Sequence, residues 1–247
     1  MKITFLGTNG WYSNENGNTL CTLLETEEYY IVFDAGDGLH KLGDYAVKNK
    51  PIFLFLSHLH LDHIVGFHTL DKFRFKNKLT VFCPKGTKKH LDKIIDHPFT
   101  ASVSSFQYEF SIEELEEGKH ELPFPFECKR LLHVDGSFGY SLMLEGKKIT
   151  HLCDTGLCEN AKFLAADSDV VLHECSLRNE VSDEVWGHVG AVGAAMVARD
   201  AKVEKLVLTH FNAEEFPLMA DRENALQKAK EIFENTSVAR DNESFEV

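Results

Sequence analysis

Four potential metal ligands lie within six positions of this sequence: His58, His60, Asp62 and His63. They directly follow an apolar run, residues 52–56, which is short and bounded and therefore reads as a buried strand. Imidazole and carboxylate groups together suit zinc, manganese or iron. His58 and His60 are two positions apart, so on an extended backbone they point the same way and can bind one ion. Asp62 and His63 follow at the turn and can face a second ion.

Other polar residues that could do chemistry also follow apolar, strand-like segments, although they are far apart in the sequence. An aspartate before Thr-Gly is otherwise a common turn residue, and a histidine at the end of a strand is otherwise ordinary. Each of these residues alone is therefore weak evidence for a functional site, and their shared position after strands strengthens that evidence. The residues are His133, Asp154, Glu174 and His210.

The elements that must position these residues alternate between strands and helices. We expect five helices: over residues 37–48, from residue 64 towards 75, from Gly86 to about residue 95, after residue 187, and around residues 225–233. In the helix after residue 187, Val189, Val192 and Met196 should share one face. Residues 96–121 are polar, and 112–121 indicate a solvated acidic loop. The expected strands cover residues 1–6, 19–24, 29–33, 52–56, 79–83, a segment from Pro125 into 131–144, 147–152, 169–172, 206–208 and 237–247.

The motif HxHxDH at residues 58–63 is the signature of the metallo-β-lactamase fold, and the chain resembles this family over essentially its whole length. The strand and Gly-Thr turn at the start, the FDAGDG segment at 33–38 and VFCPKGTKKHL at 81–91 resemble the ribonuclease Z-like branch. The resemblance implies the α/β class and a four-layer αββα sandwich with a site between two sheets. We expect residues 1–247 to form a single metallo-β-lactamase-like domain.

By this resemblance, seven residues bind two divalent ions. A water shared by the two ions would ionise near neutral pH and attack the substrate. Zinc is the expected metal, while manganese or iron would fit the same donors. One ion is assigned to His58, His60 and His133, the other to Asp62, His63 and His210, and Asp154 bridges both.

The resemblance also implies roles beside the metal. His188 stands in a GHVG segment where ribonuclease Z-like enzymes carry a GHS motif, so we expect it to donate a proton to the leaving oxygen or to contact the transition state. Glu174 is a candidate for orienting His188, and both residues have purely structural alternatives. Asp62 is counted among the catalytic residues as well as the ligands. Asp34 either supports the metal loop through hydrogen bonds or caps the following helix.

These residues predict an enzyme, a dinuclear metal-dependent hydrolase of a small phosphodiester such as a cyclic nucleotide, a nucleotide diester or a short oligonucleotide. Only twenty residues separate His133 from Asp154, which leaves no room for the arm that grips transfer RNA in ribonuclease Z. We therefore do not expect transfer RNA to be a partner. The alternatives are a hydrolase of lactones, thioesters or other carbon esters, an RNA 3′-end processing endonuclease and a metal-binding sensor without turnover. Trp11, Tyr12, Phe138 and Tyr140 are candidates for lining a substrate pocket.

The composition indicates which partners and which cellular location to expect. The formal net charge of −13 argues against a general nucleic-acid binder, which needs a basic surface. The six cysteines are scattered and show no paired CxxC spacing, and the N-terminus does not read as a signal peptide. We therefore expect reduced thiols, a cytoplasmic location and no membrane span. The resemblance, rather than the composition, adds a homodimer as one possible assembly, because related proteins are frequently dimers.

Overall fold

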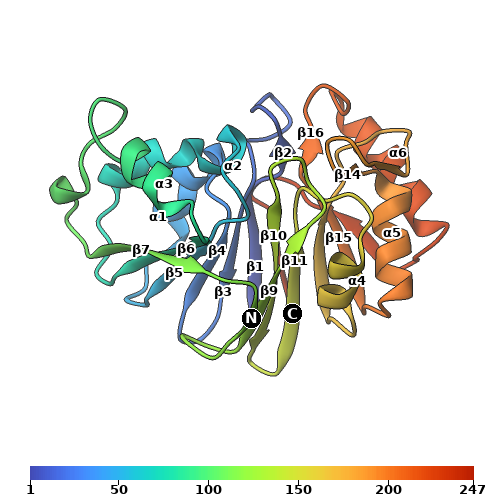
Figure 1. Ribbon diagram of the computed structural model, residues 1–247. Coiled ribbons are helices and arrows are strands. Elements are labelled where there is room, and N and C mark those ends of the chain that lie inside the picture. The colour runs from blue at the N-terminus through green and yellow to red at the C-terminus, as the bar shows by residue number, and fades with distance from the viewer.

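Two seven-stranded β-sheets stack face to face in the computed structural model, which describes residues 1–247, and helices cover both outer faces (Figure 1). The first sheet has the strand order β18-β1-β3-β4-β5-β6-β7 and is parallel from β4 to β7. Its strands are β1 (Lys2–Gly7), β3 (Cys21–Glu25), β4 (Tyr30–Phe33), β5 (Ile52–Phe55), β6 (Leu79–Pro84), β7 (Phe110–Leu115) and β18 (Ser244–Glu246).

The second sheet has the strand order β17-β15-β12-β11-β10-β9-β8. The strand β10 is antiparallel to both of its neighbours, so β9 and β11 run in the same direction, as do β12 and β15. The carboxyl ends of these four strands therefore open at one edge. The strands are β8 (Gly118–His120), β9 (Phe126–Leu131), β10 (Ser137–Leu144), β11 (Lys147–Leu152), β12 (Val170–Glu174), β15 (Lys205–Thr209) and β17 (Thr236–Val238).

Three separate apolar layers hold the sheets and helices together. The middle layer joins the two sheets and includes the buried rings of Phe33, Phe55 and Tyr140. An outer layer packs the helices that carry Leu39 and Phe67 on the first sheet, and another packs alanine-rich helices on the second. Three apolar layers between four structural layers confirm the αββα sandwich predicted from the sequence.

The helices lie on the two outer faces, with α1 to α3 over the first sheet and α4 to α6 over the second (Figure 1). Two short two-stranded pairs add to this frame: β2 (Asn9–Gly10) with β16 (Phe211–Asn212), and β13 (Ser182–Asp183) with β14 (His188–Val189). The helices are η1 (Asp37–Lys41), α1 (Leu42–Tyr45), α2 (Leu61–Ile64), η2 (Val65–Lys72), α3 (Lys88–Ile94), η3 (Val103–Ser105), α4 (Glu159–Ala165), α5 (Ala191–Asp200) and α6 (Met219–Lys230), where η marks a 3₁₀ helix.

The prediction of an acidic loop over residues 112–121 was wrong, because this segment contributes two edge strands. Ile112 and Leu115 of β7 are buried, while Glu113 and Glu114 between them are exposed. This alternation is typical of a strand with one face on the core. The number of glutamates hid the alternation in the sequence.

The final strand predicted over residues 237–247 is in fact two short strands in different sheets. The strand β17 extends the second sheet beside β15, and β18 pairs with β1 in the first sheet. The chain therefore crosses from one sheet to the other within residues 239–243, which run as a turn between them.

Two helix predictions also need correction. The helix expected over residues 37–48 is a 3₁₀ turn followed by a single α-helical turn that ends at Tyr45. The helix expected after residue 187 begins only at Ala191, so Val189 lies before it, in β14. Val192 and Met196 lie in the helix but are only half-buried. The buried face of α5 consists mostly of alanine and glycine, because small side chains let the helix lie close to the sheet.

The strands after His133 are joined by a very short connection. Glu145 and Gly146 alone link β10 to β11, both with positive φ (51° and 77°), and Leu144 pairs with Lys147 across the turn. This is the two-residue hairpin turn that matches the twist of antiparallel strands. No inserted segment stands at this place in the chain.

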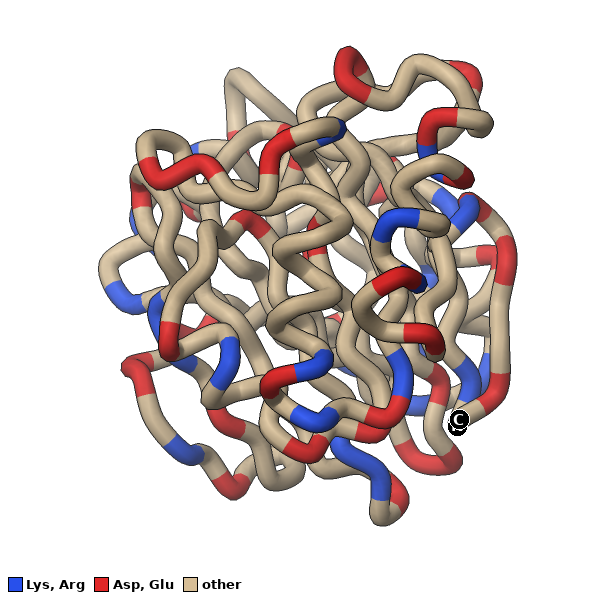
Figure 2. The backbone as a smooth tube through the Cα atoms, turned by 90° about the vertical axis from the view of Figure 1, so that its right-hand side faces the viewer, with Lys and Arg blue, Asp and Glu red and all other residues tan.

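Charged residues are mixed along the chain. In the view of Figure 2, acidic and basic residues are interspersed over the helices and loops, without a uniformly basic stretch. None of the helices combines the length and the apolar character that crossing a lipid bilayer would require.

Candidate metal centre

The candidate ligands come together because the strands that carry them end at the same edge. His58 and His60 follow β5, His133 follows β9, Asp154 follows β11 and His210 follows β15. Asp154 and His210 have the unusual positive φ values of 51° and 49°. Such backbone conformations are uncommon outside glycine and concentrate at functional sites, where the surrounding structure holds them. The sheets thus turn side chains from four separate strands towards one point.

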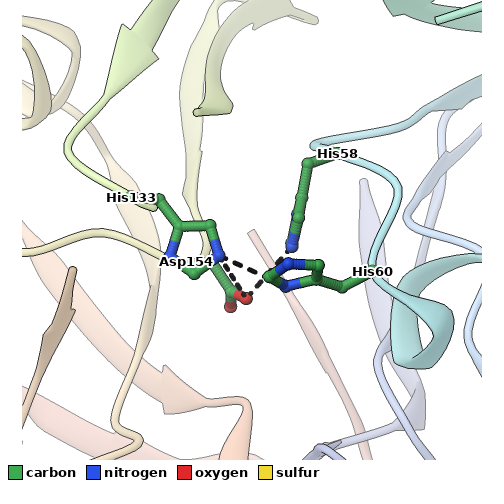
Figure 3. Close-up of side chains that lie close together, drawn as sticks. All are labelled: His58, His60, His133 and Asp154. Carbon is green, nitrogen blue, oxygen red and sulfur yellow. Dashed lines mark hydrogen bonds and ion pairs between the residues drawn. The ribbon is translucent and has the colours of Figure 1, made fainter. Parts of the chain in front are cut away.

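Four of the predicted ligands form a first group, shown in Figure 3. The Nε2 atom of His133 lies 3.3 Å from Nδ1 of His60. Oδ2 of Asp154 lies 3.4 Å from Nε2 of His58 and 3.8 Å from Nε2 of His133. The side chains from both sheets point towards one another, so these atoms could hold one ion.

A second group shares Asp154 with the first. The Nε2 atoms of His63 and His210 are 3.1 Å apart, and Oδ2 of Asp154 lies 3.3 Å from His63 Nε2. Oδ2 of Asp62 is 3.3 Å from His210 Nε2 and 3.6 Å from His63 Nε2. All seven residues predicted as ligands are therefore adjacent, and Asp154 lies between the two groups.

The spacing of these atoms fits a metal ion. Two nitrogen ligands at zinc–nitrogen distances in a tetrahedral site stand about 3.3 Å apart. The observed separations between facing donor atoms, 3.1 to 3.8 Å, agree with that value. His58 Nε2 is moreover buried without any hydrogen-bond partner, which is costly unless another species occupies the space in front of it.

The outer ring nitrogen of each histidine has its own polar neighbour, which leaves the inner nitrogen free for an ion. Such outer contacts fix the ring and the tautomer of metal ligands. Asp135 and Ser176 belong to these contacts, and neither residue was predicted from the sequence. The pairs are His58 Nδ1 with Ser57 Oγ, His60 Nε2 with Asp135 Oδ2, His63 Nδ1 with Asp34 Oδ2, His133 Nδ1 with the carbonyl oxygen of Gly187, and His210 Nδ1 with Ser176 Oγ.

The electrostatics of the site also suit cations. Burial lowers the pKa of His58 well below its usual value, and it lowers that of His133, so both rings are neutral, as ligands must be. Burial alone would also lower the pKa of His63, but Asp62, Asp154 and Asp34 raise it well above its usual value. The negative charge of these carboxylates therefore favours a positive charge at this point, which a divalent ion would supply.

Asp34 contacts both ends of the metal loop, residues 57–63, which carries His58, His60, Asp62 and His63. Its Oδ1 accepts hydrogen bonds from the backbone N–H (2.8 Å) and the hydroxyl (2.9 Å) of Ser57. Its Oδ2 lies 3.2 Å from Nδ1 of His63 and 3.2 Å from Nε2 of His151. Of the two roles expected for Asp34, the contacts favour support of the loop, because no side-chain hydrogen bond caps η1.

We predict that Asp34→Asn weakens metal binding roughly 10–100-fold, the usual effect of removing an outer partner of a ligand. Asparagine tolerates the positive φ of 58° at this position, so the backbone is retained while the charge facing His63 is lost. The measurement is a zinc titration against a chromogenic chelator, with the exposed Asp44→Asn as the matched control. Equal affinity in both variants would contradict the supporting role of Asp34.

His188 and Glu174 lie beside the ligands. Nδ1 of His188 is 3.0 Å from Oε1 of Glu174, and Glu174 is fully buried. The Glu174 carboxylate also accepts the backbone N–H groups of Thr155 and Ser176. Burial would lower the pKa of His188, but Glu174 outweighs it and raises this pKa to about 9. The ring is thus held in place, and Glu174 favours its protonated form.

A cavity of about 460 Å³ opens onto this site. Of the four aromatic residues expected at a pocket, Trp11 lines this cavity, whereas Tyr140 is buried and donates its hydroxyl to the carbonyl oxygen of Leu56. Trp186 lines the cavity too and was not predicted, because nothing in the sequence links its loop to the metal motif. The cavity is lined by Gly10, Trp11, His60, Asp62, Asp154, Ser176, Leu177, Asp183, Trp186, His188, His210 and Asn212.

The fold and the clustered histidines and carboxylates define a metal-dependent hydrolase. The chain belongs to the metallo-β-lactamase superfamily, since the beta-lactamase superfamily domain matches residues 29–211. The chain is 28% identical to the ribonuclease Z of Bacillus mycoides, over all of this chain and 99% of that protein. That alignment runs over 312 positions, whereas this chain has 247 residues, so the relative contains segments that this chain lacks.

Two solved structures share the fold closely. The metallo-β-lactamase fold protein YhfI from Bacillus subtilis superimposes with a TM-score of 0.81 at 18% identity, covering 99% of both chains. The short form of human tRNase Z superimposes with a TM-score of 0.79 at 22% identity, covering 100% of this chain and 99% of the other. The predicted metallo-β-lactamase fold of the ribonuclease Z-like kind is thereby confirmed.

Proposed function

We propose that the protein is a dinuclear metal-dependent phosphodiesterase that acts on a small substrate. His58, His60 and His133 would hold one ion, Asp62, His63 and His210 the other, and Asp154 would bridge them. Bound divalent ions supply an activated water and neutralise the charge that develops on the phosphoryl oxygens. Zinc is the first choice for this donor set, and manganese or iron would also fit.

The observation that carries the phosphodiester assignment is the His188–Glu174 pair beside the ligands. The contact of Nδ1 with Glu174 leaves Nε2 of His188 for a substrate in the cavity that this ring lines. A protonated imidazole at this place can give its proton to the leaving oxygen of a diester. Glu174 acts as a positioning residue, because it fixes the ring and stabilises the imidazolium form.

A small substrate is supported by the surroundings of the cavity. Its volume of about 460 Å³ lies in the range of small-molecule sites. None of its lining residues is lysine or arginine, so no side chain there could follow an extended phosphate backbone. The two-residue turn at Glu145 and Gly146 stands where the transfer-RNA arm would be inserted. The homodimer and the cytoplasmic location stay predictions from the sequence.

The RNA 3′-end endonuclease is the second candidate, because the relatives at 28% identity are ribonucleases Z. Residues 96–121, now seen as β7, β8 and their connections, include the acidic residues Glu113, Glu114, Glu116 and Glu117. Such a charge opposes rather than replaces an RNA-binding arm. Cleavage of a transfer-RNA precursor by the purified protein would favour this candidate.

The test is hydrolysis by protein that has been stripped and reloaded separately with zinc and with manganese. Bis(p-nitrophenyl) phosphate and a simple lactone are compared under the same conditions. We expect turnover of the diester and not of the lactone. Turnover of the lactone alone would reject the phosphodiesterase and assign the site to carbon esters. Metal binding without turnover of either substrate would indicate a sensor.

A further inference from the structure

Both tryptophans of the chain border the same cavity, although they are distant in the sequence. Trp11 is 59% exposed and Trp186 is 57% exposed, and both line the space in front of the candidate ligands. Exposing two indole rings to water is unfavourable for the protein alone. Exposed aromatic surface that gathers at one concave site is typical of a binding surface.

The backbone of Trp11 is fixed although its side chain is exposed. Its φ of +71° is an outlier for a bulky residue and persists only where the surroundings impose it. The backbone N–H of Trp11 donates to Oδ2 of Asp62 at 2.7 Å, and the ring of Tyr12 contacts the indole edge-on at 5.3 Å between centroids. The buried Arg222 of α6 donates to Thr8 and to Asn9 just before this turn. The indole therefore projects from a rigid loop beside the second ligand group.

The backbone of Trp186 is fixed as well. The carboxylate of Asp183 accepts the N–H of Val185 at 2.7 Å and the N–H of Trp186 at 3.3 Å. The carbonyl oxygen of Trp186 accepts the N–H of Val134, the residue after His133. Gly187 lies so close to this strand end that a Cβ there would stand 2.2 Å from the carbonyl oxygen of Leu132. Trp186 is thus held beside the first ligand group, and the two indoles flank the metal centre.

The charge of the cavity decides what the indoles can bind. Its ionisable lining residues outside the histidines are Asp62, Asp154 and Asp183, and no lysine or arginine faces it. One phosphate can be neutralised at the metal centre and at His188 beside it, and Asp183 is then the ionisable lining residue left to face a second phosphate. The remainder of the ligand should therefore be flat and uncharged. A nucleobase fits this description, because every base has a π-face that stacks on aromatic side chains.

We propose that Trp11 and Trp186 bind the base of a nucleoside phosphodiester whose single phosphate lies at the metal centre. This inference rests on the proposed function, since it names the substrate class of the same site. The substrate is then a nucleoside monophosphate ester, cyclic or open, and the two tryptophans determine its specificity. Their contribution is to affinity for the nucleoside and not to the chemical step.

The test compares the affinities of the zinc-loaded protein for adenosine 5′-monophosphate and for ribose 5-phosphate, which carries a hydroxyl group in place of the base. Base stacking on an aromatic residue should make the nucleotide bind roughly 5–150-fold more tightly. We expect this ratio to fall in Trp11→Asn and in Trp186→Ala and to be largely restored in Trp186→Phe. Asparagine is chosen at position 11 because it tolerates positive φ. The control is Phe163→Ala, which removes an exposed ring of α4 that lies outside this cavity.

Fluorescence provides a second readout, because each single variant leaves one tryptophan as reporter. Saturation with adenosine 5′-monophosphate should change the emission of Trp186 in Trp11→Asn and of Trp11 in Trp186→Phe, whereas ribose 5-phosphate should not. Equal affinity for the two ligands in the unmodified protein would overturn the inference, even if diesters are hydrolysed. Base-dependent binding without any diester hydrolysis would support the nucleotide site and reject the proposed phosphodiesterase activity instead.

Discussion

Asp154→Ala is expected to abolish turnover and to lower the metal content of the purified protein. Oδ2 of Asp154 faces His58 and His63, while Oδ1 lies 3.1 Å from Nδ1 of His210. No other carboxylate belongs to both groups of candidate ligands. Its removal therefore damages both ion sites at once, and the loss should exceed the roughly 10²–10⁴-fold that a general acid contributes.

The measurement combines metal analysis of dialysed protein with kcat/KM on bis(p-nitrophenyl) phosphate. Asp154→Asn separates charge from shape, since the amide tolerates the positive φ and retains one oxygen. We expect it to keep more metal than the alanine variant while remaining strongly impaired. His60→Ala should behave like Asp154→Ala in activity, but it removes a ligand from one group only. The exposed Asp92→Ala on α3 is the control for loss of a carboxylate.

Circular dichroism distinguishes a damaged site from a damaged fold. Asp154 is fully buried among histidines, so the alanine variant must first be shown to retain the αββα structure. A folded Asp154→Ala protein with normal activity would exclude the dinuclear mechanism. Activity that returns with excess zinc would mean that Asp154 contributes to metal affinity and not to the chemical step.

Part of the candidate site was predictable because two apolar strands stop just before ligands. The apolar residues of β5 and β15 end shortly before His58 and His210, so the place where each run stops is visible in the sequence. The strand β11 before Asp154 contains lysines and a histidine, so Asp154 was assigned through the resemblance to the family. Parallel strands then bring these ends to one edge. The outer partners left no such trace, because Asp135 and Ser176 meet their histidines only through the packing of loops.

Errors arose where the local pattern and the tertiary environment disagree. The strand β7 lies at a sheet edge, so Glu113 and Glu114 can face water and the segment reads as a loop. The buried side of α5 was misassigned because Val192 and Met196 are more apolar than the alanines that contact the sheet. In both cases the close approach of neighbouring elements determines burial, and a single sequence contains little information about that approach.

His188→Ala is expected to lower the rate on phosphodiesters with a basic leaving oxygen roughly 10²–10⁴-fold while the metal content stays normal. The ring touches no metal directly in our assignment, but it lies against His133, with 5.1 Å between ring centroids, and against Glu174. Metal analysis therefore has to accompany the kinetics. The exposed His68→Ala is the matched control, since the His68 ring forms a hydrogen bond with the carbonyl oxygen of Val65 and is not among the candidate ligands.

The leaving group decides which role His188 has. A general acid matters most when the leaving oxygen is basic, because a weakly basic oxygen departs without a proton. The loss in His188→Ala should therefore be small for a p-nitrophenyl ester and large for the corresponding phenyl ester. An equal loss for both esters would indicate that His188 contacts the non-bridging phosphoryl oxygens instead. No loss for either ester would make the residue structural.

Glu174→Gln completes this test, because it changes the partner of His188 without removing the ring. The buried carboxylate raises the pKa of His188, so the amide should lower that pKa and leave the imidazole neutral at a lower pH. If His188 acts as the acid, the alkaline limb of the pH–rate profile for the phenyl ester shifts to lower pH in this variant. A lower rate without movement of that limb would mean that the proton on His188 plays no part in the reaction. Glu174 would then have a purely structural role.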